Sequence, residues 1–175
     1  RCRRITKPCT DVGAFEAARA LRNGPAEQLL VVGVGNPARG DDAAGLMLGR
    51  VVAEALGAGY LAGEDVPERY SAQMRADPGT QVLFVDAVDM GMPPGHIAMV
   101  RFEDLDDTTI STHKVSLAVL ARLLEDMGGK RVRLLGIQPQ CLMWGSSVSE
   151  PVRAAVERFA RSLGAPGHPG DDRQE

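Results

Sequence analysis

Short apolar runs alternate with helix-like segments along most of this chain, and this alternation limits its possible folds more than any other feature. Two runs, at 28–35 and 81–91, are rich in β-branched residues and end at glycines, which is typical of strands buried on both faces. The order of strand, helix and strand predicts a doubly wound sheet with helices on both faces. Further strands are expected at 96–105 and 131–140, and amphipathic helices at 41–56, 111–129 and 149–164.

The domain boundaries follow from where this pattern begins and ends. With 175 residues, the chain has the length of one domain with a single core. We predict a domain at 28–164, preceded by an N-terminal extension at 1–27 with no assigned role and followed by a disordered tail at 165–175. Ser149 is expected to cap the last helix, with Pro151 in its first turn.

Charge and cysteine content exclude several classes of protein. A formal net charge of −3 gives the chain no general attraction for nucleic acid. No run approaches the ~20 apolar residues of a membrane-spanning helix, and no signal peptide is visible. Cys2, Cys9 and Cys141 form neither a disulfide framework nor a zinc-binding pair. We therefore expect a cytoplasmic protein that binds neither nucleic acid nor a membrane.

The first expected strand is followed by the loop GVGNPARGDDAAG, which begins like a nucleotide-binding loop. Gly33 and Gly35 match a dinucleotide fingerprint, but Ala38 replaces its third glycine. Asp41 and Asp42 then occupy the start of the expected helix, where their negative charges would repel a phosphate. The loop therefore favours a cation over a nucleotide, although aspartates at a helix start also act as simple helix stabilisers.

Two further residues point to the same edge of the sheet. Asp86 ends the apolar run QVLFV, where a lone buried charge needs a cation, a cap or a proton as its partner. His113 lies at the start of the next amphipathic helix. Ligand sites in such folds gather at the carboxyl ends of the strands, so Asp42, Asp86 and His113 are the candidate catalytic and metal-binding residues. Two carboxylates and one imidazole suit a transition metal such as nickel or zinc.

Four other residues are candidates for substrate binding, and each also has a simpler interpretation. Asn36 follows the glycine turn and is a common turn residue. Asp41 is expected to cap or support Asp42. Asp89 lies past the expected strand end, where a solvated turn residue is the alternative to a residue lining the cleft. Gln138 follows the last strand and is expected to form one wall of the same crevice.

Four sequence blocks resemble, in their order and spacing, the maturation proteases of NiFe hydrogenases. The blocks are GVGNPARGDDAAG, VDAVDMGMPPGHI, STHKVSL and LLGIQPQ. The adjacent aspartates and the DAVDMG block are most similar to the subgroup that acts on hydrogenase 3 and its relatives. The resemblance covers residues 29–163. It implies a three-layer α/β/α fold with a twisted, mostly parallel five-stranded sheet.

The resemblance also implies an activity and roles for individual residues. Members of this family are endopeptidases that make one cut near the C-terminus of the nickel-loaded hydrogenase large-subunit precursor, which is the implied partner. Their nickel-contacting acidic residues fall on Asp42 and Asp86, and their histidine falls on His113. The nickel comes with the precursor, so no permanently bound metal is expected. Aspartic-type and substrate-metal-assisted chemistry both fit this set of residues.

Two other functions fit the same three residues. One is a small metal-dependent hydrolase, and the other is a nickel-binding chaperone without enzymatic activity. Processing of a precursor distinguishes the protease from both. A serine hydrolase is disfavoured because WGSSVS lacks the G-x-S-x-G pattern, and Cys141 is expected to be a small buried residue rather than a nucleophile.

Overall fold

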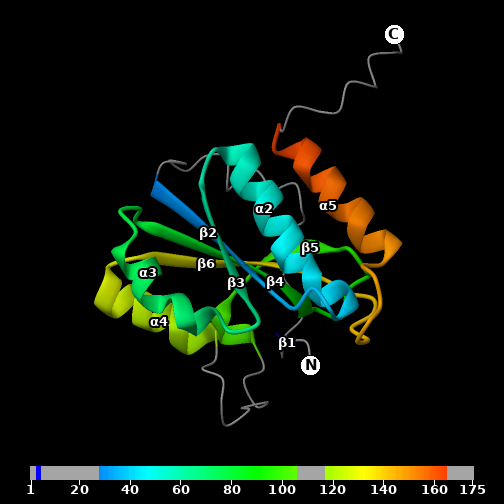
Figure 1. Ribbon diagram of the computed structural model, residues 1–175, viewed down its shortest axis with the longest axis horizontal. Helices are drawn as coiled ribbons and strands as arrows, with labels where there is room; N and C mark the ends of the chain where they lie inside the picture. The colour runs from blue at the N-terminus through cyan, green and yellow to red at the C-terminus, as the bar shows by residue number, and fades with distance from the viewer. Residues whose placement is uncertain (1–2, 5–27, 106–116, 165–175) are drawn as a thin grey trace.

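The computed structural model describes residues 3–4, 28–105 and 117–164, which form a layered α/β fold (Figure 1). The first residues of the helix expected at 111–129 and the tail expected at 165–175 lie outside these ranges. Within the described ranges, no helix combines the length and the apolar character that a membrane crossing needs.

A mostly parallel sheet forms the centre of the molecule, as predicted. Among the described residues, five strands lie side by side in the order β3 (Gly59–Glu64), β2 (Leu29–Val34), β4 (Gln81–Asp89), β6 (Arg131–Ile137) and β5 (Ile97–Val100). β3, β2, β4 and β6 are parallel to one another, whereas β5 at the edge is antiparallel to β6.

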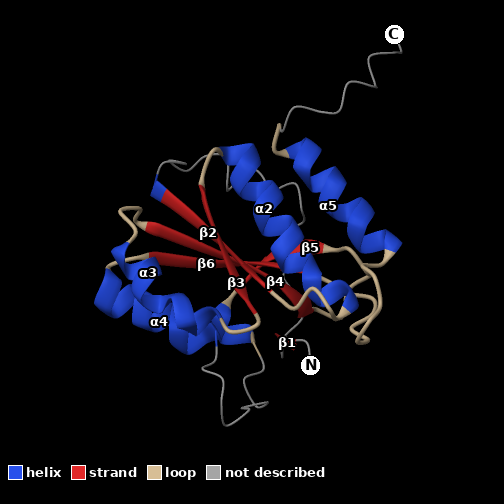
Figure 2. Ribbon diagram, viewed as in Figure 1, coloured by secondary structure: helices blue, strands red, loops and turns tan. Residues whose placement is uncertain are grey.

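Helices cover both faces of this sheet, which confirms the predicted doubly wound architecture (Figure 2). One face carries α2 (Ala44–Leu56) and α5 (Glu150–Ser162), and the other carries α3 (Ser71–Ala76) and α4 (Leu117–Gly128). Side chains alternate between the two faces along β4. Leu83 and Val85 therefore belong to the core beneath α2 and α5, while Val82 and Phe84 belong to the core beneath α3 and α4.

The parallel strands β2, β4 and β6 all end at one edge of the sheet, which we call the carboxyl edge. α2 begins at this edge because it follows β2 after a short loop. α4 leads into the start of β6 and runs back along the sheet, so its N-terminal end lies toward the carboxyl edge (Figure 1). Because binding sites in such folds lie at this edge, the fold directs both helix starts toward the region of the predicted site.

α3 is absent from the sequence prediction. It is a six-residue helix that follows a 3-10 turn, η3 (Pro67–Tyr70), and Met74 is its one buried residue. A single buried side chain produces no periodic apolar pattern. The sequence therefore carries too weak a signal to predict this helix.

β1 (Arg3–Arg4) lies inside the predicted N-terminal extension and was also not predicted. It pairs with β4 at Val88 and Asp89. The pairing of β2 with β4 ends earlier, at Gly33 and Val85, so β1 lies beside the part of β4 that β2 does not reach. Two arginines carry no apolar pattern, and only the tertiary arrangement makes them a strand.

Candidate functional site

A short acidic turn connects β2 to α2. The helix expected to start at Asp41 begins instead with a 3-10 turn, η2 (Gly40–Ala43), and α2 itself starts at Ala44. Asp41 and Asp42 therefore precede the α-helix rather than forming its first turn. Their two carboxylates have different surroundings.

Asp42 is half-buried on the outer side of this turn. Its Oδ2 accepts a hydrogen bond from the backbone N–H of Asn36 at 3.0 Å. The side-chain oxygen of Asn36 in turn accepts one from the N–H of Ala38 at 2.9 Å, which closes an Asx-type turn. Gly35 adopts a φ of +139°, and a Cβ atom there would lie 1.8 Å from the carbonyl oxygen of Asp42. Only glycine allows the loop to wrap this closely around Asp42.

Asp41 is fully buried, with 0% of its surface exposed. Its carboxylate accepts hydrogen bonds from the backbone N–H groups of Gln140 (2.7 Å), Cys141 (2.9 Å) and Ser149 (2.6 Å), and from the Ser149 hydroxyl (2.8 Å). All four donors belong to the loop between β6 and α5. Asp41 was predicted to bind the substrate, but the structure makes it an internal anchor because its carboxylate is sealed from solvent and already receives four hydrogen bonds.

Two predictions for this loop need correction. Ser149 does occupy the N-cap position of α5, with Pro151 in the first turn. Its hydroxyl makes no capping hydrogen bond, however, and donates to Asp41. Cys141, which was predicted to be buried, is only half-buried.

Asp86 lies within β4 rather than at its end, because the strand continues to Asp89. It is 2% exposed and is paired in register with Gly136 on β6. The last β4 residue paired with β2 is Val85, so Asp86 is the first residue of β4 beyond the end of that pairing. Alternation along the strand places its side chain on the face that also carries Phe84, the face covered by α4.

Gly45 in the first turn of α2 brings the two acidic positions to the same edge. A Cβ atom on Gly45 would lie 2.9 Å from the Cα of Asp86 and 2.6 Å from the carbonyl oxygen of Val85. The helix backbone thus rests directly on β4, which only a residue without a side chain permits. Because Asp42 precedes Gly45 by three residues, Asp42 and Asp86 both lie at the carboxyl edge, as predicted.

His113, the third member of the predicted set, lies outside the described residues. The described part of α4 starts four residues later, at Leu117. Within the ranges that the structure describes, no three His, Cys, Asp or Glu side chains gather to hold a metal ion. The metal-binding role of the three predicted residues therefore stays a prediction.

Gln138 and Asp89 form a hydrogen-bonded rim on the other side of the carboxyl edge. Gln138 is 7% exposed, and its Oε1 accepts hydrogen bonds from the backbone N–H groups of Met90 (2.6 Å) and Met92 (3.3 Å). Its Nε2 donates to Asp89 Oδ1 at 3.3 Å. Gln138 therefore joins the end of β6 to the loop that follows β4, and its substrate-binding role stays a prediction.

Asp89 has a further partner that the sequence did not reveal. Arg4 on β1 forms an ion pair with its Oδ2 at 2.8 Å. Burial by itself raises the pKa of Asp89, but hydrogen bonds from Arg4, Gln138 and the Gly91 N–H outweigh this effect and hold the pKa below its ordinary value. Asp89 is thus a paired residue rather than the solvated turn residue considered as an alternative.

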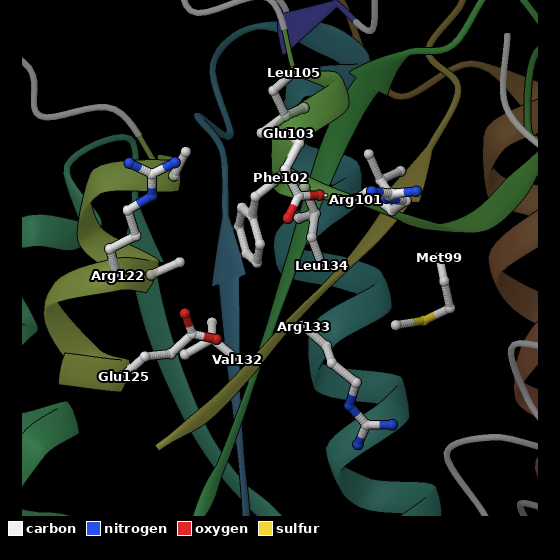
Figure 3. Close-up of a pocket in the computed structure, with 13 residues that line it drawn as sticks. Met99, Arg101, Phe102, Glu103, Leu105, Arg122, Glu125, Val132, Arg133 and Leu134 are labelled. Atoms are coloured by element: carbon white, nitrogen blue, oxygen red, sulfur yellow. Dashed lines mark hydrogen bonds and ion pairs between the residues drawn. The ribbon is translucent and has the colours of Figure 1, made fainter. Parts of the chain in front are cut away.

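A hollow elsewhere on the described surface is lined by none of the described candidate residues (Figure 3). It borders the amino-terminal half of β6, including Val132 and Arg133, and is also lined by Phe102, Arg122 and Glu125. This half of β6 lies away from the carboxyl edge. The hollow is therefore separate from Asp42 and Asp86.

The candidate site thus presents two acids in different environments. Asp42 is partly accessible to solvent, where a carboxylate can bind a cation or accept a proton from water. Asp86 is almost completely buried, where an ionised carboxylate requires a compensating partner. Together they suit hydrolysis or recognition of a cation at the carboxyl edge.

This chain is similar in sequence to known hydrogenase maturation proteases. A family model described as hydrogenase maturation protease, HycI, matches residues 61–163. The hydrogenase 3 maturation protease of Escherichia coli K12 is 34% identical over 134 residues, which cover 74% of this chain and 85% of the relative.

Solved structures of similar fold include hydrogenase maturation proteases. A NiFe hydrogenase maturation protease HycI from Thermococcus kodakarensis superposes with a TM-score of 0.70 at 26% identity, covering 83% of this chain and 94% of that one. The solution structure of the endopeptidase HycI from Escherichia coli gives a TM-score of 0.65 at 31% identity, with coverage of 82% and 94%.

Proposed function

Because this chain belongs to the hydrogenase maturation protease family, we propose that it removes the C-terminal extension of the nickel-loaded large-subunit precursor of a NiFe hydrogenase. Its similarity to an endopeptidase and to hydrogenase maturation proteases supports both the reaction and the partner. In this proposal the nickel arrives with the precursor and is part of the substrate.

The contact between α2 and β4 is the observation that carries the proposal. It brings Gly45, which follows Asp42 by three residues, against the backbone of β4 at Asp86. α4, which follows His113 by a few residues, covers the face on which Asp86 lies. Asp42, Asp86 and His113 then contact the nickel of the precursor and position the peptide bond to be cut.

Asp42 is the general base in this mechanism. It is the more accessible of the two acids and can take a proton from a water molecule as the water attacks the carbonyl carbon of the peptide bond. The carbon–nitrogen bond then breaks, and the proton passes to the departing amine. Asp86 and His113 hold the nickel and so fix the position of the bond relative to Asp42.

The surrounding residues position this machinery. The N–H of Asn36 holds the carboxylate of Asp42 through a 3.0 Å hydrogen bond, which leaves its second oxygen for water. Asp89 and Gln138 line the path of the extension on the opposite rim. Asp41 supports the site indirectly through the loop that it anchors.

Substitution of the three principal residues tests the proposal. Asp42→Asn, Asp86→Asn and His113→Ala are each expected to lower the rate of precursor processing by about 100-fold or more, since each removes a group that acts on the reacting atoms. Processing is measured as the loss of mass of the purified nickel-loaded precursor after mixing. Thermal unfolding of each variant should stay close to that of the unmodified protein.

Asp126→Asn is the matched control, because Asp126 is an exposed acid near the C-terminal end of α4, which lies away from the carboxyl edge. It should process the precursor at the normal rate. Normal processing by Asp86→Asn would show that the site is wrongly assigned. A precursor whose mass never changes, together with tight nickel binding by this protein alone, would favour a nickel chaperone.

A further inference from the structure

An exposed apolar turn lies in the loop between β6 and α5. Met143 and Trp144 occupy its tip, with 69% and 73% of their surfaces exposed. Val148, later in the same loop, packs against the core instead. Methionine and tryptophan are both enriched at contacts between proteins. Two such side chains exposed side by side therefore indicate a binding surface.

Asp41 holds both ends of this loop. Its carboxylate binds the backbone at Gln140 and Cys141 before the tip and at Ser149 after it. Its own N–H donates to the carbonyl oxygen of Cys141 at 2.8 Å. A buried carboxylate with this many charge-assisted hydrogen bonds restrains the loop strongly.

The tip itself is also restrained. The carbonyl oxygen of Met143 accepts hydrogen bonds from the hydroxyl (2.6 Å) and the N–H (3.3 Å) of Ser146, which closes the turn. The backbone is therefore ordered on both sides of Trp144, while the two apolar side chains remain in solvent. The turn therefore holds the backbone of Met143 and Trp144 in a fixed conformation before any partner binds.

The same turn is joined to the loop that carries Asp42. The N–H of Gly145 donates to the carbonyl oxygen of Ala38 at 2.7 Å, and the N–H of Gly40 donates to that of Ser146 at 3.1 Å. Ala38 and Gly40 lie between Asn36 and Asp42 in the sequence. The exposed pair is thus fixed to the wall of the candidate site.

We propose that Met143 and Trp144 form a docking anchor for the protein substrate, and that they insert into an apolar depression on the hydrogenase large-subunit precursor beside the extension to be cut. This inference rests on the proposed function. The turn is hydrogen-bonded to the loop that carries Asp42, so a protein bound to Met143 and Trp144 also lies against the candidate site. The protein substrate is therefore the partner that fits this position. Preformed aromatic anchors lose little conformational freedom on binding and carry a large share of the affinity.

Substrate kinetics test the anchor. Trp144→Ala is expected to raise the KM for the nickel-loaded precursor by about tenfold or more and to leave kcat nearly unchanged, because Trp144 contributes to docking and not to the chemical step. Thermal unfolding should be unaffected, since the side chain is exposed. Met127→Ala is the matched control: Met127 is 66% exposed at the far end of α4, and its KM should stay normal.

Trp144 also provides a direct probe of contact, because it is the only tryptophan in the chain. Protein labelled with 5-fluorotryptophan has a single fluorine resonance. In the Asp42→Asn background, nickel-loaded precursor should shift that resonance in a saturable manner. An unshifted resonance at saturation, or an unchanged KM for Trp144→Ala, overturns the proposal.

Two further outcomes separate the possible failures. If Asp42→Asn still cuts the precursor, the proposed catalytic role fails, while the KM of Trp144→Ala continues to test the anchor. If the fluorine resonance shifts when the labelled protein alone is concentrated, and sedimentation shows dimers, the turn joins two copies of this chain and the anchor proposal is overturned.

Discussion

Asp41 and Asp89 lie on opposite sides of the carboxyl edge, and each carboxylate joins segments that are distant in sequence. Asp41 is completely buried, and its carboxylate accepts hydrogen bonds from the loop between β6 and α5. Asp89 is 29% exposed at its side chain and pairs with Arg4, which is 72% exposed. The comparison shows that burial, rather than the number of hydrogen bonds, decides whether an acid holds the fold or remains available at a surface.

Removing the carboxylate of Asp41 should have the largest effect on stability. Asp41→Ala should lower the free energy of unfolding by about 3 kcal/mol or more, because three N–H groups and a hydroxyl lose the buried charged acceptor that holds their loop. Urea denaturation of Asp41→Ala and of the exposed control Asp126→Ala measures the effect, and the control should change by no more than about 0.5 kcal/mol. Equal stability of the two variants would refute the anchoring role of Asp41.

Gln138 belongs to the same hydrogen-bonded rim as Asp89, and its removal should lower stability by an intermediate amount. Gln138→Ala removes a buried acceptor from the N–H groups of Met90 and Met92, so a loss of about 1–3 kcal/mol is expected. Gln140→Ala is the matched control, since Gln140 is exposed and its hydrogen bond to Asp41 uses the backbone. The difference in urea midpoint between the two variants checks this prediction, and no difference would contradict it.

Substitution of Asp89 should have the smallest effect on the free energy of unfolding. Its pair with Arg4 is largely solvated, so Asp89→Asn should cost less than about 1 kcal/mol at neutral pH. Hydrogen bonds lower its pKa in the folded protein. The stabilisation is therefore complete above the ordinary aspartate pKa of about 3.9 and is lost as the pH falls through the lower folded value.

This pH dependence can be measured against the substituted protein. The unmodified protein should lose its advantage over Asp89→Asn when urea midpoints are compared at pH 7 and then at pH 3 or below. A constant difference across that range would show that Asp89 is not stabilised in its charged form.

Much of the fold could be predicted from local sequence patterns. The buried strands around Val31 and Leu83 are almost entirely apolar, and a strand covered on both faces requires such a run. α3 and β1 were not accessible, because Met74 alone or a pair of arginines produces no periodic signal. Their places depend on chain segments far away in the sequence.

The candidate site divides in the same way. The sequence placed Asp42 and Asp86 at one edge, because residues that follow parallel strands share that edge. It did not distinguish Asp41 from Asp42, since both are aspartates before the same helix. The partners of Asp41 are about 100 residues away, and no local pattern records them.

The sequence by itself therefore determined the alternating layers, the parallel strands and the edge at which acidic residues collect, because periodicity and strand direction are local properties of the chain. Tertiary structure alone decided which carboxylate is sealed, which one meets solvent and where Met143 and Trp144 are presented. These outcomes depend on desolvation and on hydrogen bonds between distant segments, which exist only once the chain is folded.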